Sequence, residues 1–122
     1  MLHRYLLYFF SLLLLGSCAY DNAEDIVKPQ QPCATPATVS YALHISPLLD
    51  RNCRSCHSAV LVSGNVNLDN LTEIQTRART GQLMGVVTHA PGFQQMPQGG
   101  AKLSDCDIAL LQQWVTAGAP NN

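Results

Sequence analysis

The sequence contains few charged residues and no excess of positive charge. Asp, Glu, Lys and Arg make up 12% of the 122 residues, and the formal net charge at pH 7 is −1. Nucleic-acid binding needs a basic surface that neutralises phosphates, so the composition offers no reason to expect a nucleic-acid partner. The length fits one small domain, and no internal repeat divides the chain.

The sequence also lacks a second Cys-x-x-Cys pair to accompany Cys53 and Cys56, and it lacks a His-x-x-x-His pair. A structural zinc site needs four ligands, usually from two such pairs. A zinc site would have to recruit Cys33 and Cys106, which leaves the neighbouring His57 without a role. A thioredoxin-like redox pair opens a helix that follows a strand, and no strand pattern precedes this one. Both alternatives are therefore disfavoured.

The apolar run near the start, Leu6 to Leu15, has ten residues and is too short to span a bilayer. Arg4 precedes it and small residues follow it, which is the layout of a secretory signal. Its end, LGSC, resembles a bacterial lipoprotein signal, in which the cysteine is lipidated and becomes the new N-terminus. We therefore expect a signal peptide at residues 1–17 and lipidation of Cys18. A free Cys18 after ordinary cleavage and a buried core helix are the alternatives.

Lipidation would hold the exported chain on the cell envelope, at the periplasmic face of the inner or outer membrane or at the cell surface. Several acyl chains on one cysteine anchor stably, whereas a single chain binds only marginally. Residues 18–40 contain three prolines and no helical period, which predicts a lipidated N-terminus followed by a tether. Outside the cytoplasm, disulfides persist and thiols rarely stay free.

Three segments after the tether carry helix signals. The first is expected around residues 47–52, with Ser46 as N-cap and Pro47 in its first turn. The second covers residues 71–79, after which Gly81 and Gly85 interrupt the pattern.

The last helix is the clearest in the chain. Ser104 is its expected N-cap, and Gly118 with Pro120 ends it. Its apolar stripe consists of Ile108, Leu110, Leu111, Trp114 and Val115. The result is an all-α sketch with two long loops, and so small a domain buries little core by itself. A large apolar cofactor would fill the space that the loops enclose.

Residues 53–57 read CRSCH. The thiols of Cys53 and Cys56 can add to the two vinyl groups of a haem, and His57 is then held directly below the iron. Cys-x-x-Cys-His is the attachment motif of haem c, and it uses every residue of the pattern. We therefore expect one haem c, attached covalently through the two cysteines.

The chain from about Tyr41 to Asn122 resembles the small class I c-type cytochromes of bacteria, of the lipoprotein type. The stretches that carry the resemblance are HISPLLDRNCRSCH, GQLMGVVTH, MPQGGAKLSD and IALLQQWVTAGAPNN. The resemblance implies an all-α class I cytochrome c fold for residues 41–122, a small helical bundle around one haem. It also implies that His57 and Met96 bind the two faces of the iron.

The residues themselves also favour Met96. Met84 lies in the apolar stretch QLMGVV, where a methionine of the core is the simpler interpretation. Met96 lies in the polar loop QQMPQGG, where the proline stiffens the chain and the glycines allow close approach to a flat ligand. His89, which would give a bis-histidine site, and an open sixth position are the alternatives.

The remaining cysteines are Cys33 and Cys106. With Cys18 lipidated and two cysteines attached to haem, this even pair in an oxidising compartment predicts a disulfide. It would tie the tether to the start of the last helix.

With both axial positions filled, the iron would only exchange electrons. We therefore expect a membrane-tethered electron-transfer protein and not an enzyme, with other redox proteins as partners. It would be a monomer or a subunit of a membrane redox complex. Two alternatives stay open: a haem-bearing subunit or domain of a larger oxidoreductase, and an open-site haem protein that binds small gases or peroxide.

Overall fold

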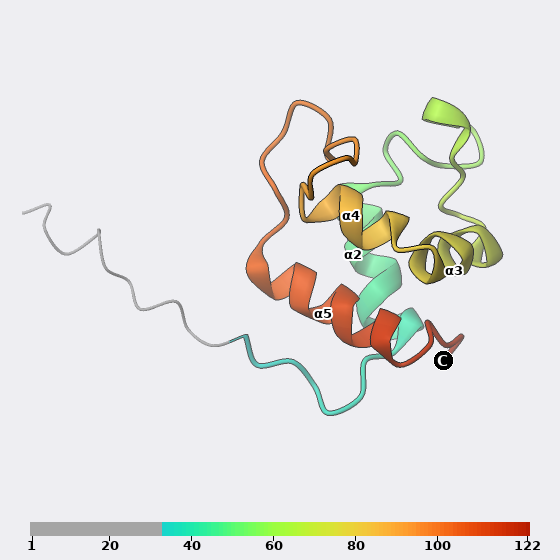
Figure 1. Ribbon diagram of the computed structural model, residues 1–122. Coiled ribbons are helices and arrows are strands. Elements are labelled where there is room, and N and C mark those ends of the chain that lie inside the picture. The colour runs from blue at the N-terminus through green and yellow to red at the C-terminus, as the bar shows by residue number, and fades with distance from the viewer. Residues whose placement is uncertain (1–32) are drawn as a thin grey trace, which may run out of the picture. The chain divides into compact units, whose positions relative to one another are not determined.

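Helices make up the regular structure of residues 33–122, which the computed structural model describes, and these residues form no strand (Figure 1). The all-α prediction is therefore confirmed for this part of the chain. In the same residues no helix has the length and apolar character needed to cross a membrane. The expected signal peptide, Cys18 and most of the expected tether lie outside the described residues. The elements are η2 (Tyr41–Ile45), α2 (Ser46–Asn52), η3 (Ser63–Asn65), α3 (Leu71–Arg79), α4 (Gln82–Val87) and α5 (Asp105–Thr116).

The first helical segment begins earlier than the sequence predicts. The π-helical turn η2 runs directly into α2, and the Ser40 hydroxyl accepts a hydrogen bond from the Leu43 amide at its start. The prediction of Ser46 as N-cap was wrong, because its backbone is already helical and continues the preceding turn. Pro47 does lie in the first turn of α2, where its missing N–H costs nothing.

Helices α3 and α4 are separated by Gly81, whose φ of +76° suits glycine. The prediction for α3 is confirmed, and the Asn70 side chain caps it by accepting from the amides of Thr72 and Glu73. The prediction that Gly85 also interrupts the helical pattern was wrong, because Gly85 lies inside α4. Gly85 is needed there for space: an added Cβ would approach the Phe93 ring to 2.6 Å.

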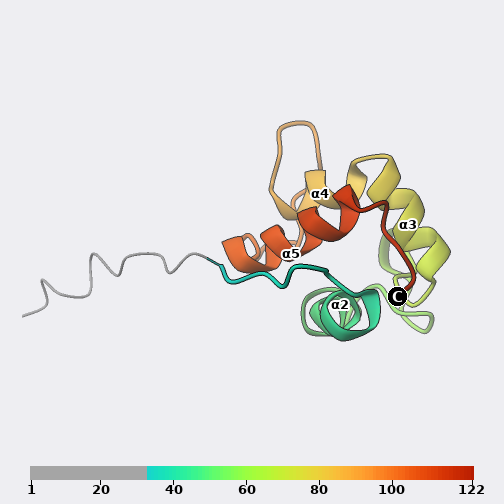
Figure 2. The same cartoon turned by 90° about the horizontal axis from the view of Figure 1, so that it is seen from below.

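Helix α5 supplies the centre of the core, as its apolar stripe predicts. The Ser104 hydroxyl caps it by accepting from the Asp107 amide, and Leu111 and Trp114 are fully buried. Tyr41 of η2 lies against Trp114, with 5.8 Å between ring centroids. Figure 2 shows α2 nearly end-on with α5 running across it. The buried side chains are Val39, Ile45, Leu48, Leu49, Leu68, Ile74, Ala78, Leu83, Val87, Leu103, Leu111, Trp114 and Ala119.

Residues 33–40 form no helix or strand and belong to the same compact unit as the helices. Cys33 forms a disulfide with Cys106 in the first turn of α5, with 5.1 Å between the Cα atoms, which is the pairing expected from the sequence. The Gln113 side chain donates hydrogen bonds to the carbonyls of residues 36 and 37, and Val39 is buried. The end of the expected tether is thus fixed to α5.

Candidate functional site

The Cys-x-x-Cys-His motif forms a tight turn at the end of α2. Cys53 follows the last residue of the helix, and its amide donates to the Leu49 carbonyl at 2.8 Å. The Cys53 carbonyl then accepts from the amides of Cys56 and His57 at 3.1 and 3.0 Å. These bonds bring the two thiols and the imidazole onto one short turn, where a single group could engage all three.

Both cysteines of the motif are free thiols in different surroundings. Cys53 is partly buried and packs against the core, whereas Cys56 is exposed. Burial raises the pKa of the Cys53 thiol from 9.0 to about 11, although the neighbouring Arg54 charge acts in the opposite direction. Cys53 is therefore a protonated thiol at neutral pH.

The His57 imidazole is oriented by a backbone carbonyl. Its Nδ1 atom lies 3.0 Å from the Ser63 carbonyl oxygen, which can only accept, so Nδ1 carries the proton. The lone pair is then on Nε2, the atom that would face a metal. The Leu68 amide also donates to the His57 carbonyl at 2.7 Å, which fixes the backbone on the other side of the residue. An imidazole held in this way can act as a metal ligand without rearrangement.

Met96 lies in the loop between α4 and α5, with a partly buried side chain. Its amide donates to the Val86 carbonyl at 3.0 Å, and its own carbonyl lies 3.1 Å from Nε2 of His89. Both sides of the Met96 backbone are therefore attached to the end of α4 and the turn after it. Met84, in contrast, packs against the core, as its apolar surroundings predict.

His89 was the alternative to Met96 as a ligand. Because the Met96 carbonyl can only accept, the Nε2 atom of His89 is the donor in their hydrogen bond. His89 could therefore offer a metal only its Nδ1 atom while this bond is kept. In the structure its side chain supports the loop that carries Met96.

The loops that carry the candidate ligands combine exposed apolar side chains with an absence of charge. Residues 55–68 and 80–101 contain no Asp, Glu, Lys or Arg. Val60 is 96% exposed and Leu61 53%, while Val62 and Phe93 are each 41% exposed. The consecutive side chains of Val60, Leu61 and Val62 form an exposed apolar cluster, and such clusters can mark sites for an apolar ligand or a partner.

A zinc site built from four cysteines is not available. Cys33 and Cys106 are bonded to each other, which removes two of the four thiolates that such a site needs. Within residues 33–122, no three His, Cys, Asp or Glu side chains gather closely enough to hold a metal ion.

Two features of the site had no clear sequence signal. The contact of Phe93 with Gly85 joins the Met96 loop to α4, and the hydrogen bonds of Arg54 join the motif to distant segments. Both involve residues that are not sequence neighbours, such as Arg54 and Leu68, which are 14 positions apart. The only local hint is that a charged residue stands inside the motif, next to a long uncharged stretch.

No protein-family model matches the chain, and no curated protein or solved structure matches it.

Proposed function

We propose that the chain is a monohaem c-type cytochrome with the class I fold, which transfers single electrons between redox proteins. The observation that carries the proposal is the turn at residues 53–57. It presents two free thiols beside an imidazole whose Nε2 lone pair is left available by the bond from Nδ1 to Ser63.

The cysteines of the described residues support covalent attachment. Cys33 and Cys106 are paired, so Cys53 and Cys56 are the thiols that remain. An exported chain rarely keeps two thiols free unless a ligand takes them. Thioether bonds to a haem would use both sulfurs, and they agree with the spacing of the motif.

The donor set of His57 and Met96 suits haem iron. Imidazole nitrogen and thioether sulfur are neutral ligands, and the Met/His pair is the axial pair of cytochromes c. The bound haem would supply a one-electron ferric–ferrous couple. In this proposal, His57 would bind the iron through its oriented ring, and Met96 would supply the second protein ligand and keep exogenous ligands out. The thioether raises the reduction potential relative to two histidines.

The apolar loops fit the same proposal. A porphyrin presents a large flat apolar surface, and the core of residues 33–122 is small for its length. The uncharged segments 55–68 and 80–101 could lie against such a surface without burying an unpaired charge.

The location of the protein belongs to the proposal as well. We propose export, lipidation at Cys18 and anchoring to the cell envelope, with redox proteins as partners of a monomer or of a subunit of a membrane redox complex. The second candidate function is an open-site haem protein.

Mass spectrometry and optical spectra of the purified full chain test the proposal. We expect one haem that survives denaturation, thioether bonds at both motif cysteines, and low-spin spectra in both redox states. Ferrous protein that binds carbon monoxide rapidly would favour the open-site alternative. Haem that acid solvent extracts freely, or a chain that takes up no haem in a host with haem-attachment machinery, would contradict covalent attachment.

A further inference from the structure

Arg54 lies inside the motif, between the two cysteines, and its side chain points into the protein. The side chain is 14% exposed, compared with 61% for Arg51, three residues earlier. A guanidinium that gives up most of its hydration needs several partners in return. Arg54 has them on two segments of the chain, the helical segment before the motif and the loop after it.

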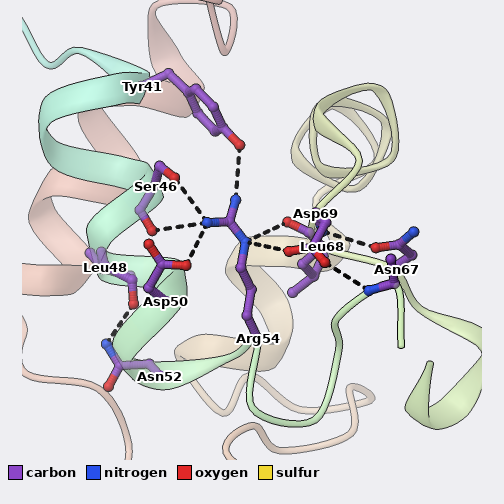
Figure 3. A network of polar contacts seen from close by, with 10 residues as sticks. Tyr41, Ser46, Leu48, Asp50, Asn52, Arg54, Asn67, Leu68 and Asp69 are labelled. Carbon is purple, nitrogen blue, oxygen red and sulfur yellow. Dashed lines mark hydrogen bonds and ion pairs between the residues drawn. The ribbon is translucent and has the colours of Figure 1, made fainter. Parts of the chain in front are cut away.

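The contacts of Arg54 use all three nitrogens of the guanidinium (Figure 3). Nη2 donates to the Tyr41 hydroxyl at 3.1 Å. Nη1 donates to the Ser46 hydroxyl at 2.9 Å and to Asp50 Oδ1 at 2.8 Å. Nε donates to the Leu68 carbonyl at 2.9 Å and lies 3.2 Å from Asp69 Oδ1.

These partners surround the motif. Tyr41 and Asp50 belong to the helical segment before it, while Leu68 belongs to the loop after it. Leu68 connects Arg54 with His57, the proposed iron ligand. The Leu68 carbonyl accepts a hydrogen bond from Arg54, and the Leu68 amide donates one to the His57 carbonyl. Arg54 therefore helps to position the backbone of Leu68, which in turn is bonded to the backbone of His57.

The charge of Arg54 is secured by the same contacts. Burial acts to lower the pKa of the guanidinium, but the hydrogen bonds and charges of Asp50 and Tyr41 more than offset it, so the pKa is raised. Arg54 remains a cation. A lysine would keep the charge, but its single ammonium group cannot reproduce the planar guanidinium that contacts both segments.

We infer that Arg54 is a positioning residue for the haem-attachment turn. Resting on the proposed function, the inference is that Arg54 holds Cys53 and His57 in the arrangement that accepts haem, through its bonds to α2 and to Leu68. It touches neither iron nor haem in this role and acts through the backbone of the motif.

Thiol labelling of the full chain produced without haem tests the inference independently of the cofactor. Cys53 is partly buried, so a neutral alkylating reagent reaches it when the turn opens, whereas Cys56 is exposed in either state. Loss of charge-assisted hydrogen bonds favours opening by about tenfold or more. We expect Arg54→Gln and Arg54→Lys to speed the labelling of Cys53 relative to Cys56 by about that factor. Arg51→Gln, the matched loss of charge, should leave the ratio unchanged.

Trp114 fluorescence reports whether each variant keeps its core. Faster labelling of Cys53 with native fluorescence supports the inference, and a parental ratio in both Arg54 variants overturns it. If Arg54→Gln unfolds, Ser46→Ala and Asp69→Ala, which each remove the side-chain acceptor of one partner, are labelled instead, and the same two outcomes support or overturn the inference.

The reduction potential of the haem-loaded protein separates position from charge. If the planar guanidinium and its several donors matter, the potential and the low-spin spectrum of Arg54→Lys should differ from those of the parent. If Arg54→Lys has the parental potential and spectrum, only the charge of Arg54 matters, and the inference is overturned. A parent that carries no haem would contradict the proposed function and would leave the labelling result standing.

Discussion

At the scale of single residues, the candidate site depends on backbone carbonyls that orient side chains. The Ser63 carbonyl fixes the proton on Nδ1 of His57, and the Met96 carbonyl fixes the proton on Nε2 of His89. The two histidines therefore differ in which nitrogen stays available. This difference is the structural reason to propose His57 as a ligand and His89 as a support for Met96.

Substitution of Met96 should change the sixth coordination position of the haem-loaded protein. Met96→Ala removes the thioether, so we expect rapid binding of carbon monoxide to the ferrous form. Met96→His should stay low-spin at a lower potential, because imidazole favours ferric iron. Spectra and potentiometry measure both effects. Met84→Leu is the control, and such volume-conserving swaps cost less than about 1.5 kcal/mol. An unchanged spectrum in Met96→Ala would make Met96 an ordinary loop residue.

Substitution of His89 should weaken the ligation by Met96 and should not abolish haem attachment. His89→Leu removes the donor to the Met96 carbonyl, so we expect a fraction of the ferrous protein to bind carbon monoxide. His89→Gln keeps a donor and should recover part of the parental behaviour. Titration with carbon monoxide gives the fraction. A bis-histidine site would instead lose its low-spin spectrum in both variants.

The Cys53 thiol should make the haem-free chain less stable in alkaline solution. Its raised pKa means that the folded state holds this proton more tightly than the unfolded state. The contribution is therefore fully present below pH 9.0 and is lost as the pH rises toward about 11. Urea unfolding at several pH values measures the slope. Cys53→Ser should remove this part of the slope, and an equal slope in the variant would argue against burial as the cause.

At the scale of elements, short helices are connected by loops that tertiary contacts hold in place. The loop between α4 and α5 is attached through Met96 to Val86 and through Phe93 to Gly85. The Met96 attachment is a hydrogen bond to the Val86 carbonyl. The Phe93 attachment depends on the absence of a side chain at Gly85, which leaves room for the ring.

Gly85→Ala should destabilise the protein despite the higher helix propensity of alanine. The new Cβ would meet the Phe93 ring at 2.6 Å, and overpacking of this kind costs about 1–3 kcal/mol. In a Phe93→Ala background the space is free, so the same change should stabilise the helix by up to about 1 kcal/mol. Thermal unfolding of the four proteins gives the coupling. A destabilisation that persists without Phe93 would mean that another contact excludes the methyl group.

The elements that the sequence predicts well are those with local signals. Helices α3 and α5 carry their caps, Asn70 and Ser104, next to a clear apolar period. The start of η2 was missed because its cap, Ser40, follows a proline-rich stretch whose composition predicts a tether. The helix α4 was missed because Gly85 reads as a break when the position of Phe93 is unknown.

The same distinction applies to the candidate site. The motif residues are adjacent in the sequence, so their spacing alone predicts haem attachment, and this stays a prediction. The partners of Arg54 span residues 41 to 69, and the bond from His89 to Met96 joins two sides of a loop. Such contacts exist only after the chain has folded, and one sequence carries no local signal for them.

At the scale of the whole molecule, the described residues form one unit closed by a covalent bond between its first residue and the start of α5. The disulfide spans a sequence separation of 73 residues and encloses all elements before α5. A small core is therefore supplemented by a cross-link that restricts the unfolded chain.

Removal of this disulfide should lower the stability of the protein substantially. For a loop of this length, the chain-entropy estimate is about 4 kcal/mol. We expect Cys33→Ser/Cys106→Ser to unfold at a lower urea concentration than the parent by a corresponding amount. Gln113→Ala, which removes only the hydrogen bonds to residues 36 and 37, is the control and should cost much less. Equal stability of parent and double variant would show that the cross-link constrains the unfolded state little.

The same cross-link decides how mechanical tension passes through the molecule. A pull on the chain that precedes Cys33 reaches Cys106 directly through the sulfur–sulfur bond, and from there it follows α5 to Asn122. The backbone between the two cysteines lies on a side branch of this covalent path. The motif, the Met96 loop and the Arg54 contacts all belong to that branch. If the chain is anchored as proposed, tension from its N-terminal side would have a covalent path that bypasses the backbone carrying His57.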